Sequence, residues 1–68
     1  MKTIDARGLS CPRPVILAQN AIRTGEFPIE IWVDSAAARE NVSRAARKAG
    51  LHVSVQEQGA EYRLTMNR

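Results

Sequence analysis

The chain has 68 residues, of which 44% are hydrophobic and 25% are charged, and its formal net charge is +3. This composition is typical of one small globular domain and argues against intrinsic disorder. The single cysteine and single histidine exclude an internal disulfide framework and a zinc site of four Cys and His ligands, so we expect no metal and no cofactor. Because no apolar run could cross a bilayer and no secretory signal is evident, we expect a cytoplasmic protein without membrane contact.

Glycine and proline divide the chain into six elements. Residues 2–6 predict a short strand, and a loop over residues 7–10 leads into the segment Cys11–Pro14. Prolines are tolerated in the first turn of a helix, where the N–H groups have no intrahelical acceptor. We therefore expect a helix that starts in this segment and ends at Gly25. One stripe of this helix is apolar, which leaves Ile16 exposed on the opposite side.

The second strand and second helix follow directly. Apolar and polar residues alternate over Ile29–Val33, which predicts a strand with one buried face. Either Asp34 or Ser35 can cap the next helix, and Gly50 ends it. The side chains of this helix expected to face water are Arg39, Asn41, Ser43, Arg44, Arg47 and Lys48.

Two further strands are expected around residues 51–55 and 62–66, joined by a hairpin turn at residues 58–60. The element order is then β-α-β-α-β-β. Each strand has one apolar and one polar face, which predicts an α+β fold: a two-layer α/β sandwich with two helices on one face of a four-stranded mixed sheet. Right-handed crossovers and a final strand inserted beside the second favour the strand order 1-2-4-3. Trp32 should lie on the helix-free face and pack on the fourth strand.

Cys11 is the residue best suited to chemistry. Loops after parallel strands and the starts of the following helices share one sheet edge, where ligands usually bind. A thiol at a helix N-terminus feels the positive end of the helix dipole, and Arg7 and Arg13 add positive charge, so we expect an accessible thiolate. Pro12 and Pro14 stiffen the turn and lack N–H groups, which leaves the N–H groups of Arg13 and Val15 as the donors nearest the sulfur.

The rest of the sequence limits what this thiolate can do. A cysteine hydrolase needs a histidine base within reach, and His52 is expected at the opposite edge of the sheet. A redox couple would need a second cysteine in the chain. The remaining chemistry is a thiolate that accepts and releases one group while partner proteins supply the catalysis. We therefore expect a carrier more than a stand-alone enzyme.

The segment Asp5–Pro14, with the sequence DARGLSCPRP, resembles the opening motif of the TusA family of sulfur carriers, also called SirA-like or YedF-like proteins. The resemblance extends over residues 1–68 and implies one carrier domain with the same β-α-β-α-β-β sandwich. It implies that Cys11 receives sulfur as a persulfide from a cysteine desulfurase and passes it to an acceptor protein. The residues expected to shape this site are Arg7, Gly8, Pro12, Arg13 and Pro14.

Two segments depart from the most common pattern of the family. Gln19 and Asn20 stand where many members have lysines, and Glu40 begins a segment where members that thiolate tRNA tend to have an Asp-Ile-Pro sequence. The stretch Val33–Val42 instead resembles the carrier domain of YedF-type proteins associated with selenium metabolism, which another domain often follows. The cargo is then sulfur or selenium, and the chain is either a stand-alone protein or a segment of a longer one.

Partner proteins are expected to contact Ile16 and Gln19, because Ile16 lies about one helical turn beyond Cys11 on the face away from the core. Two alternatives remain. One is a redox-sensing thiol, which would carry a sulfenic acid or a mixed disulfide in place of a persulfide. The other is a nucleic-acid-binding module, in which phosphates of the nucleic acid contact four side chains of the second helix: Arg39, Arg44, Arg47 and Lys48. The lack of an aromatic platform disfavours this alternative.

Overall fold

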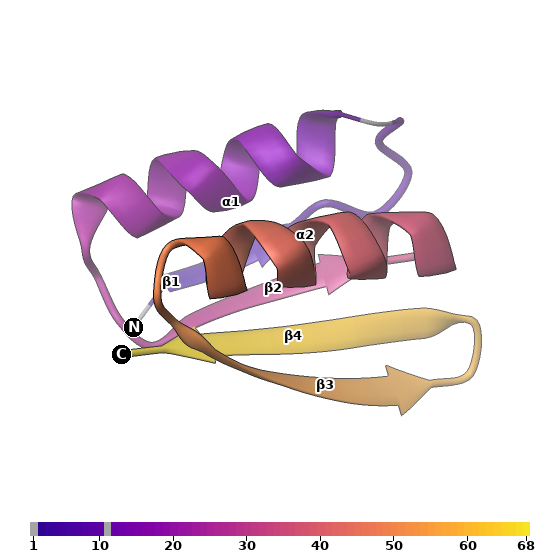
Figure 1. Cartoon of the computed structure of the whole chain (residues 1–68). Coiled ribbons are helices and arrows are strands. Elements are labelled where there is room, and N and C mark those ends of the chain that lie inside the picture. The colour runs from indigo at the N-terminus through magenta and orange to yellow at the C-terminus, as the bar shows by residue number, and fades with distance from the viewer. Residues whose placement is uncertain (1, 11) are drawn as a thin grey trace.

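The computed structural model describes residues 2–10 and 12–68. Two helices and four strands alternate in the predicted order (Figure 1). Their bounds are β1 (Lys2–Asp5), α1 (Arg13–Thr24), β2 (Ile29–Val33), α2 (Ala36–Lys48), β3 (His52–Gln58) and β4 (Glu61–Asn67).

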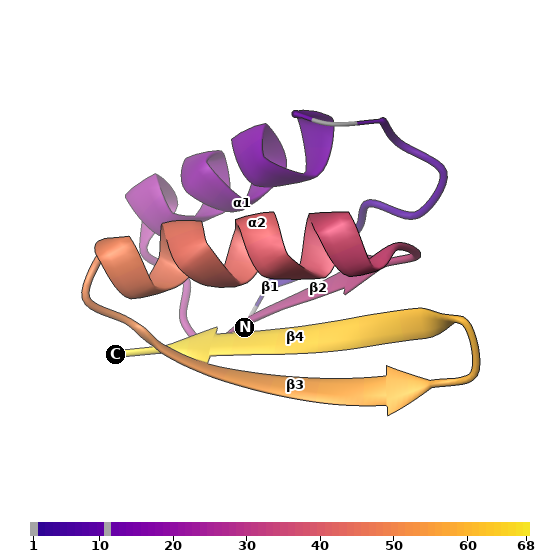
Figure 2. The same ribbon diagram turned by 45° about the vertical axis from the view of Figure 1, so that its right-hand side comes forward.

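The four strands form one sheet in the order β1-β2-β4-β3, which confirms the predicted topology. β1 runs parallel to β2, whereas β4 is antiparallel to both β2 and β3. Both helices cover the same face of the sheet, so the architecture is the predicted two-layer α+β sandwich (Figures 1 and 2). In the described part of the chain, neither helix has the length and apolar character needed to cross a membrane.

The core lies between the sheet and the helices, and the strands supply its largest side chains. The helices contribute mostly alanines, whose small size lets both helices lie close to the sheet. The buried apolar residues are Ala6, Ala18, Ala21, Ile29, Ile31, Val33, Ala38, Val42, Ala46, Leu64 and Met66.

The ends of the helices follow the sequence signals. Gly25 ends α1 and Gly50 follows α2, with φ angles of 75° and 83° in the left-handed region that favours glycine. Of the two possible caps of α2, Ser35 is the one used, because its side chain accepts a hydrogen bond of 3.1 Å from the Ala38 amide. The Asp34 carboxylate therefore does not cap α2 and instead accepts a hydrogen bond from the loop between β1 and α1.

Several side chains differ from the prediction because their surroundings come from tertiary packing. Ser43 was expected to face water but is only 2% exposed, since α2 packs against both α1 and the sheet and buries a wider arc than its apolar stripe. Arg39 is half-buried, with its guanidinium 4.9 Å from the centre of the Tyr62 ring. Val55 belongs to the apolar face predicted for the third strand, but it remains 43% exposed because β3 is an edge strand.

The helix-free face of the sheet is polar and carries Trp32, as predicted. Trp32 pairs with Arg63 across β2 and β4, and the Arg63 guanidinium lies 5.6 Å from the centre of the indole ring. Arg63 also lies 3.8 Å from the carboxylate of Glu30 on β2. The indole therefore packs on the fourth strand through an arginine.

Candidate functional site

The loop between β1 and α1 is anchored to the core. The Ala6 amide donates a 2.9 Å hydrogen bond to the Trp32 carbonyl, so the chain follows β2 for one residue beyond β1. Ala6 is 1% exposed, and Leu9 packs against the core from the other end of the loop. These contacts hold the loop at the carboxyl ends of β1 and β2, the edge where open α/β sheets usually bind ligands.

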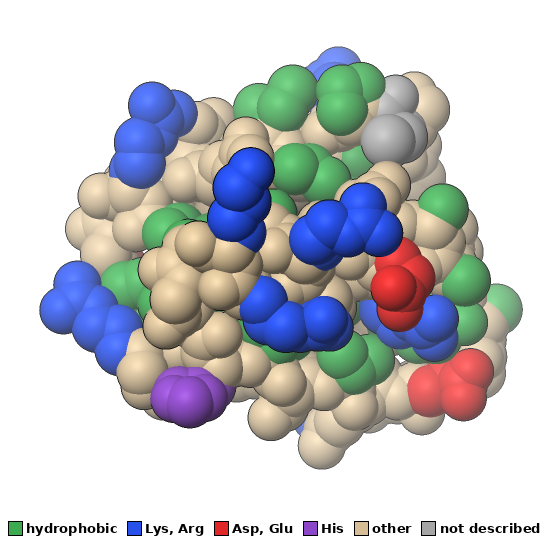
Figure 3. Space-filling model, in the orientation of Figure 1, with side chains coloured by type: hydrophobic (Ala, Val, Ile, Leu, Met, Phe, Trp, Pro, Cys, Tyr) green, Lys and Arg blue, Asp and Glu red, His purple; other side chains and the backbone are tan. Residues whose placement is uncertain are grey.

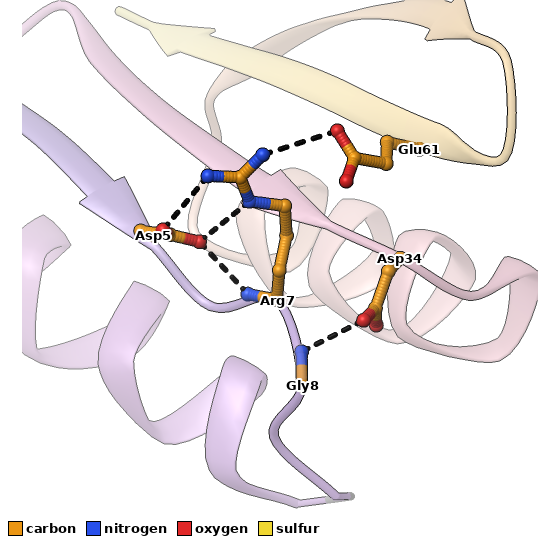
Figure 4. A network of polar contacts seen from close by, with 5 residues as sticks. All are labelled: Asp5, Arg7, Gly8, Asp34 and Glu61. Atoms are coloured by element: carbon orange, nitrogen blue, oxygen red, sulfur yellow. Dashed lines mark hydrogen bonds and ion pairs between the residues drawn. The ribbon is translucent and has the colours of Figure 1, made fainter.

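Asp5 and Arg7 form a clamp at the start of this loop (Figure 4). The Asp5 carboxylate accepts hydrogen bonds from the Arg7 amide (3.1 Å), Nε (2.9 Å) and Nη2 (2.9 Å). Arg7 Nη1 also donates to Glu61 of β4 at 3.1 Å. The side-chain and backbone hydrogen bonds from Arg7 lower the pKa of Asp5 from 3.8 to about 2, and pairing with Asp5 and then Glu61 raises the pKa of Arg7.

Gly8 is held by a second carboxylate. Its amide donates a hydrogen bond of 2.7 Å to Asp34 Oδ2, from the loop that follows β2 (Figure 4). The φ angle of Gly8 is 78°, a conformation that residues with a Cβ rarely adopt. Gly8 therefore lets the chain turn sharply while Asp34 fixes the direction of the turn.

Helix α1 begins directly after this loop, with Pro12 at its N-cap, followed by Arg13 and Pro14. Pro14 is fully buried, whereas Pro12 and Arg13 are exposed. The Arg13 amide donates a hydrogen bond of 2.9 Å to the Ser10 carbonyl. Cys11 itself lies outside the described residues, and its accessibility and ionisation stay predictions.

Arg7 takes part in two ion pairs and lies against an aromatic ring. Two carboxylates, Asp5 and Glu61, balance its charge, and its guanidinium lies 5.5 Å from the centre of the Trp32 ring. These ion pairs reduce the positive charge that Arg7 adds beside the start of α1, and its effect on the thiol stays a prediction. Its contacts also fix the shape of the loop.

Two adjoining hollows form a groove between α1 and α2, with volumes of about 500 Å³ and about 320 Å³. Gln19, Ala45 and Lys48 line both hollows, and Pro12 lines the smaller one. Ile16 is 45% exposed, which confirms its predicted exposure, but it is not among the described residues that line the groove. The two side chains expected to contact partners thus differ in position: Gln19 lies in the groove and Ile16 outside it.

Comparison with known proteins identifies the family. A family model described as sulfurtransferase TusA matches residues 2–68. The chain belongs to the TusA family. The crystal structure of a SirA-like protein from Desulfitobacterium hafniense resembles this TusA-family chain with a TM-score of 0.90 and 30% sequence identity, over 98% of this chain and 96% of that one. No curated protein gave a significant match. Membership of the TusA family indicates a role in carrying or relaying sulfur.

Sequence reasoning missed the carboxylates that hold the loop of this TusA-family chain. Asp5 is the last residue of β1 and Asp34 directly follows β2. The carboxyl ends of these two parallel strands meet at one edge of the sheet. An aspartate that accepts from an amide two residues later is also a recognised turn pattern. Both signals are present in the sequence, whereas Glu61 reaches Arg7 only through the sheet register and could not be found from the sequence.

The Asp5–Arg7 clamp predicts a measurable shift in titration. Replacing Arg7 with Ala is expected to raise the pKa of Asp5 from about 2 toward 3.8, because the largest stabilising hydrogen bonds are lost. NMR titration of the Asp5 carboxyl carbon measures this change. Because the folded-state pKa is the lower one, the clamp stabilises the fold above a pH of about 3.8, and that contribution disappears as the pH falls toward about 2.

A matched control removes a positive charge elsewhere on the TusA-family chain. Arg47 is exposed on α2, so Arg47→Ala should leave the Asp5 titration at about 2. An Asp5 midpoint that does not move in the Arg7→Ala variant would contradict the clamp.

Proposed function

We propose that residues 1–68 act as one sulfur carrier domain in which Cys11 takes sulfane sulfur from a cysteine desulfurase and passes it to an acceptor protein. The observation that carries this proposal is the TusA family match over residues 2–68, which spans Cys11 and the surrounding segment Asp5–Pro14. The similarity to a SirA-like protein over nearly the whole chain supports it. In this role the domain carries a group and does not need a catalytic base of its own.

The transfer follows the chemistry of thiol–disulfide exchange. The Cys11 thiolate attacks the terminal sulfur of a persulfide on the desulfurase, and a new S–S bond forms to Cys11. The S–S bond of the donor breaks, and the donor cysteine leaves as a thiolate with the bonding electron pair. No external oxidant or reductant is needed. Delivery repeats the step with an acceptor thiolate as the attacking group.

The described residues around position 11 suit such a step. Pro12 and Pro14 restrict the backbone of the first turn of α1, and the N-terminus of this helix favours a nearby anion. Arg7 and Gly8 are tied through Asp5 and Asp34, so the loop that leads into Cys11 has a defined course. We propose that these contacts present the thiol to partner proteins.

The position of the single histidine also favours a carrier over a hydrolase. β3 begins at His52, at the end of the sheet opposite the start of α1 (Figure 1). A histidine at that place cannot act as the base for a group beside the start of α1. We place the relay in the cytoplasm, where reducing conditions keep a single thiol free for sulfur transfer.

Mass spectrometry of the intact chain tests this function. After incubation with a cysteine desulfurase and cysteine, we expect an added mass of about 32 Da, located on Cys11 by peptide mapping and removed by a reducing agent. An unmodified chain would contradict the carrier role, and one added oxygen without desulfurase would support a redox-sensing thiol. Because Val33–Val42 resembles YedF-type carriers, a parallel reaction with selenocysteine tests selenium as the cargo.

A further inference from the structure

Charge is unevenly distributed between the two layers of the fold. The two helices contain six basic residues and one acidic residue, whereas the rest of the chain contains four basic and six acidic residues. Lys and Arg side chains are spread over the helix-covered face, while the acidic side chains visible in the same view lie toward one end (Figure 3). The helices therefore carry a formal charge of +5 and the rest of the chain carries −2.

The groove between α1 and α2 lies within this basic layer. Its basic lining residues are Arg23, Arg44 and Lys48, and apolar atoms between them come from Val15, Ile22, Ala45 and Ala49. Arg44 and Lys48 are one helical turn apart on α2, so their charged groups flank the same stretch of groove. Neither of them lies within 4.0 Å of a carboxylate in the described part of the chain.

We propose that this groove binds an acidic segment of a partner protein. The carboxylates of the segment contact Arg44 and Lys48, and its aliphatic side chains lie between α1 and α2. Charge complementarity identifies the occupant, since unpaired cations beside an apolar floor suit carboxylates interspersed with aliphatic residues. Pro12 lines one end of the groove, so a segment bound there lies beside the residue that follows Cys11. That the partner donates or accepts sulfur rests on the proposed function; the binding itself does not.

A protein segment fits this groove better than single-stranded nucleic acid. Base stacking requires an aromatic platform, and none of the described residues that line the groove is aromatic. The three aromatic rings of the chain, those of Phe27, Trp32 and Tyr62, each lie against an arginine outside the groove. The basic residues alone would also attract phosphates, so RNA is included as an outcome of the test.

The test is an NMR titration of the ¹⁵N-labelled chain with the peptide acetyl-Glu-Leu-Glu-Glu-Leu-Glu-amide. We expect the largest amide shifts at groove residues such as Gln19, Ala45 and Lys48. Lys48→Glu is expected to weaken binding roughly fivefold to tenfold, as for the reversal of an exposed ion pair. Arg47→Glu changes the net charge equally, in the same last turn of α2 but outside the groove, and should weaken binding by less than about twofold because salt screens distant charges.

Three results would overturn the proposal. These are equal weakening by Lys48→Glu and Arg47→Glu, peptide-induced shifts confined to the helix-free face, and binding of an oligouridine with no binding of the peptide. The titration does not involve the chemistry of Cys11. A chain that binds the peptide but is never loaded with sulfur would therefore contradict only the proposed function, and the reverse result would contradict only the groove.

Discussion

A Cys11→Ser chain is expected to take up no sulfur from a cysteine desulfurase while keeping its fold. Serine is similar in size to cysteine, but its hydroxyl cannot form the sulfur–sulfur bond that the transfer requires. Intact mass spectrometry should show complete loss of the added mass of about 32 Da. If Cys11 is exposed as predicted, the substitution changes stability by no more than about 0.5 kcal/mol, and the circular dichroism spectrum and the unfolding midpoint should stay unchanged.

Ser10→Ala provides the matched control for this experiment. It changes the exposed neighbour of Cys11 and leaves the backbone carbonyl that accepts from Arg13 in place. Loading of this variant should equal that of the unmodified sequence. Sulfur uptake by the Cys11→Ser chain would refute the assignment of the acceptor, since the sequence contains no other cysteine.

Ile31→Ala is expected to destabilise the fold by about 2–5 kcal/mol, the usual cost of removing a buried isoleucine side chain. Ile31 is 0% exposed in the central region of the sheet, between Ile4 of β1 and Leu64 of β4. A chain of this size has a total stability of roughly 3–10 kcal/mol, so the variant should be only marginally folded. Chemical denaturation followed by circular dichroism measures the change.

Ile16→Ala is the matched control, because it removes the same side chain from an exposed site on α1. It should change the free energy of unfolding by no more than about 0.5 kcal/mol, since alanine also favours the helix. Equal destabilisation by the two variants would contradict the described core.

Local signals in the sequence were sufficient to predict the architecture. The alternation in Ile29–Val33 and the glycines at positions 25 and 50 mark elements whose limits depend on neighbouring residues only. The strand order followed from the handedness of crossover connections, a rule that holds for nearly all sheets. These features could be predicted because each depends on backbone geometry or on periodicity, which the sequence displays directly.

Features that depend on contacts between distant segments could not be predicted in this way. Ser43 was expected to face water because it is polar, but the packing of α2 against both α1 and the sheet buries it. Arg7 was assigned to the site because it is close to Cys11 in sequence, yet the register of β4 brings Glu61 within 3.1 Å of its guanidinium. Similarly, the groove beside Gln19 exists only because α1 and α2 lie next to each other.

The hydrogen bond from Gly8 to Asp34 joins two turns that are 26 positions apart in the sequence. Gly8 belongs to the segment that leads into α1, and Asp34 directly precedes Ser35, the cap of α2. Regions coupled in this way tend to open and close together in hydrogen exchange. The beginnings of both helices should thus behave as one cooperative unit, so that a macromolecule seated on either of them slows amide exchange at both.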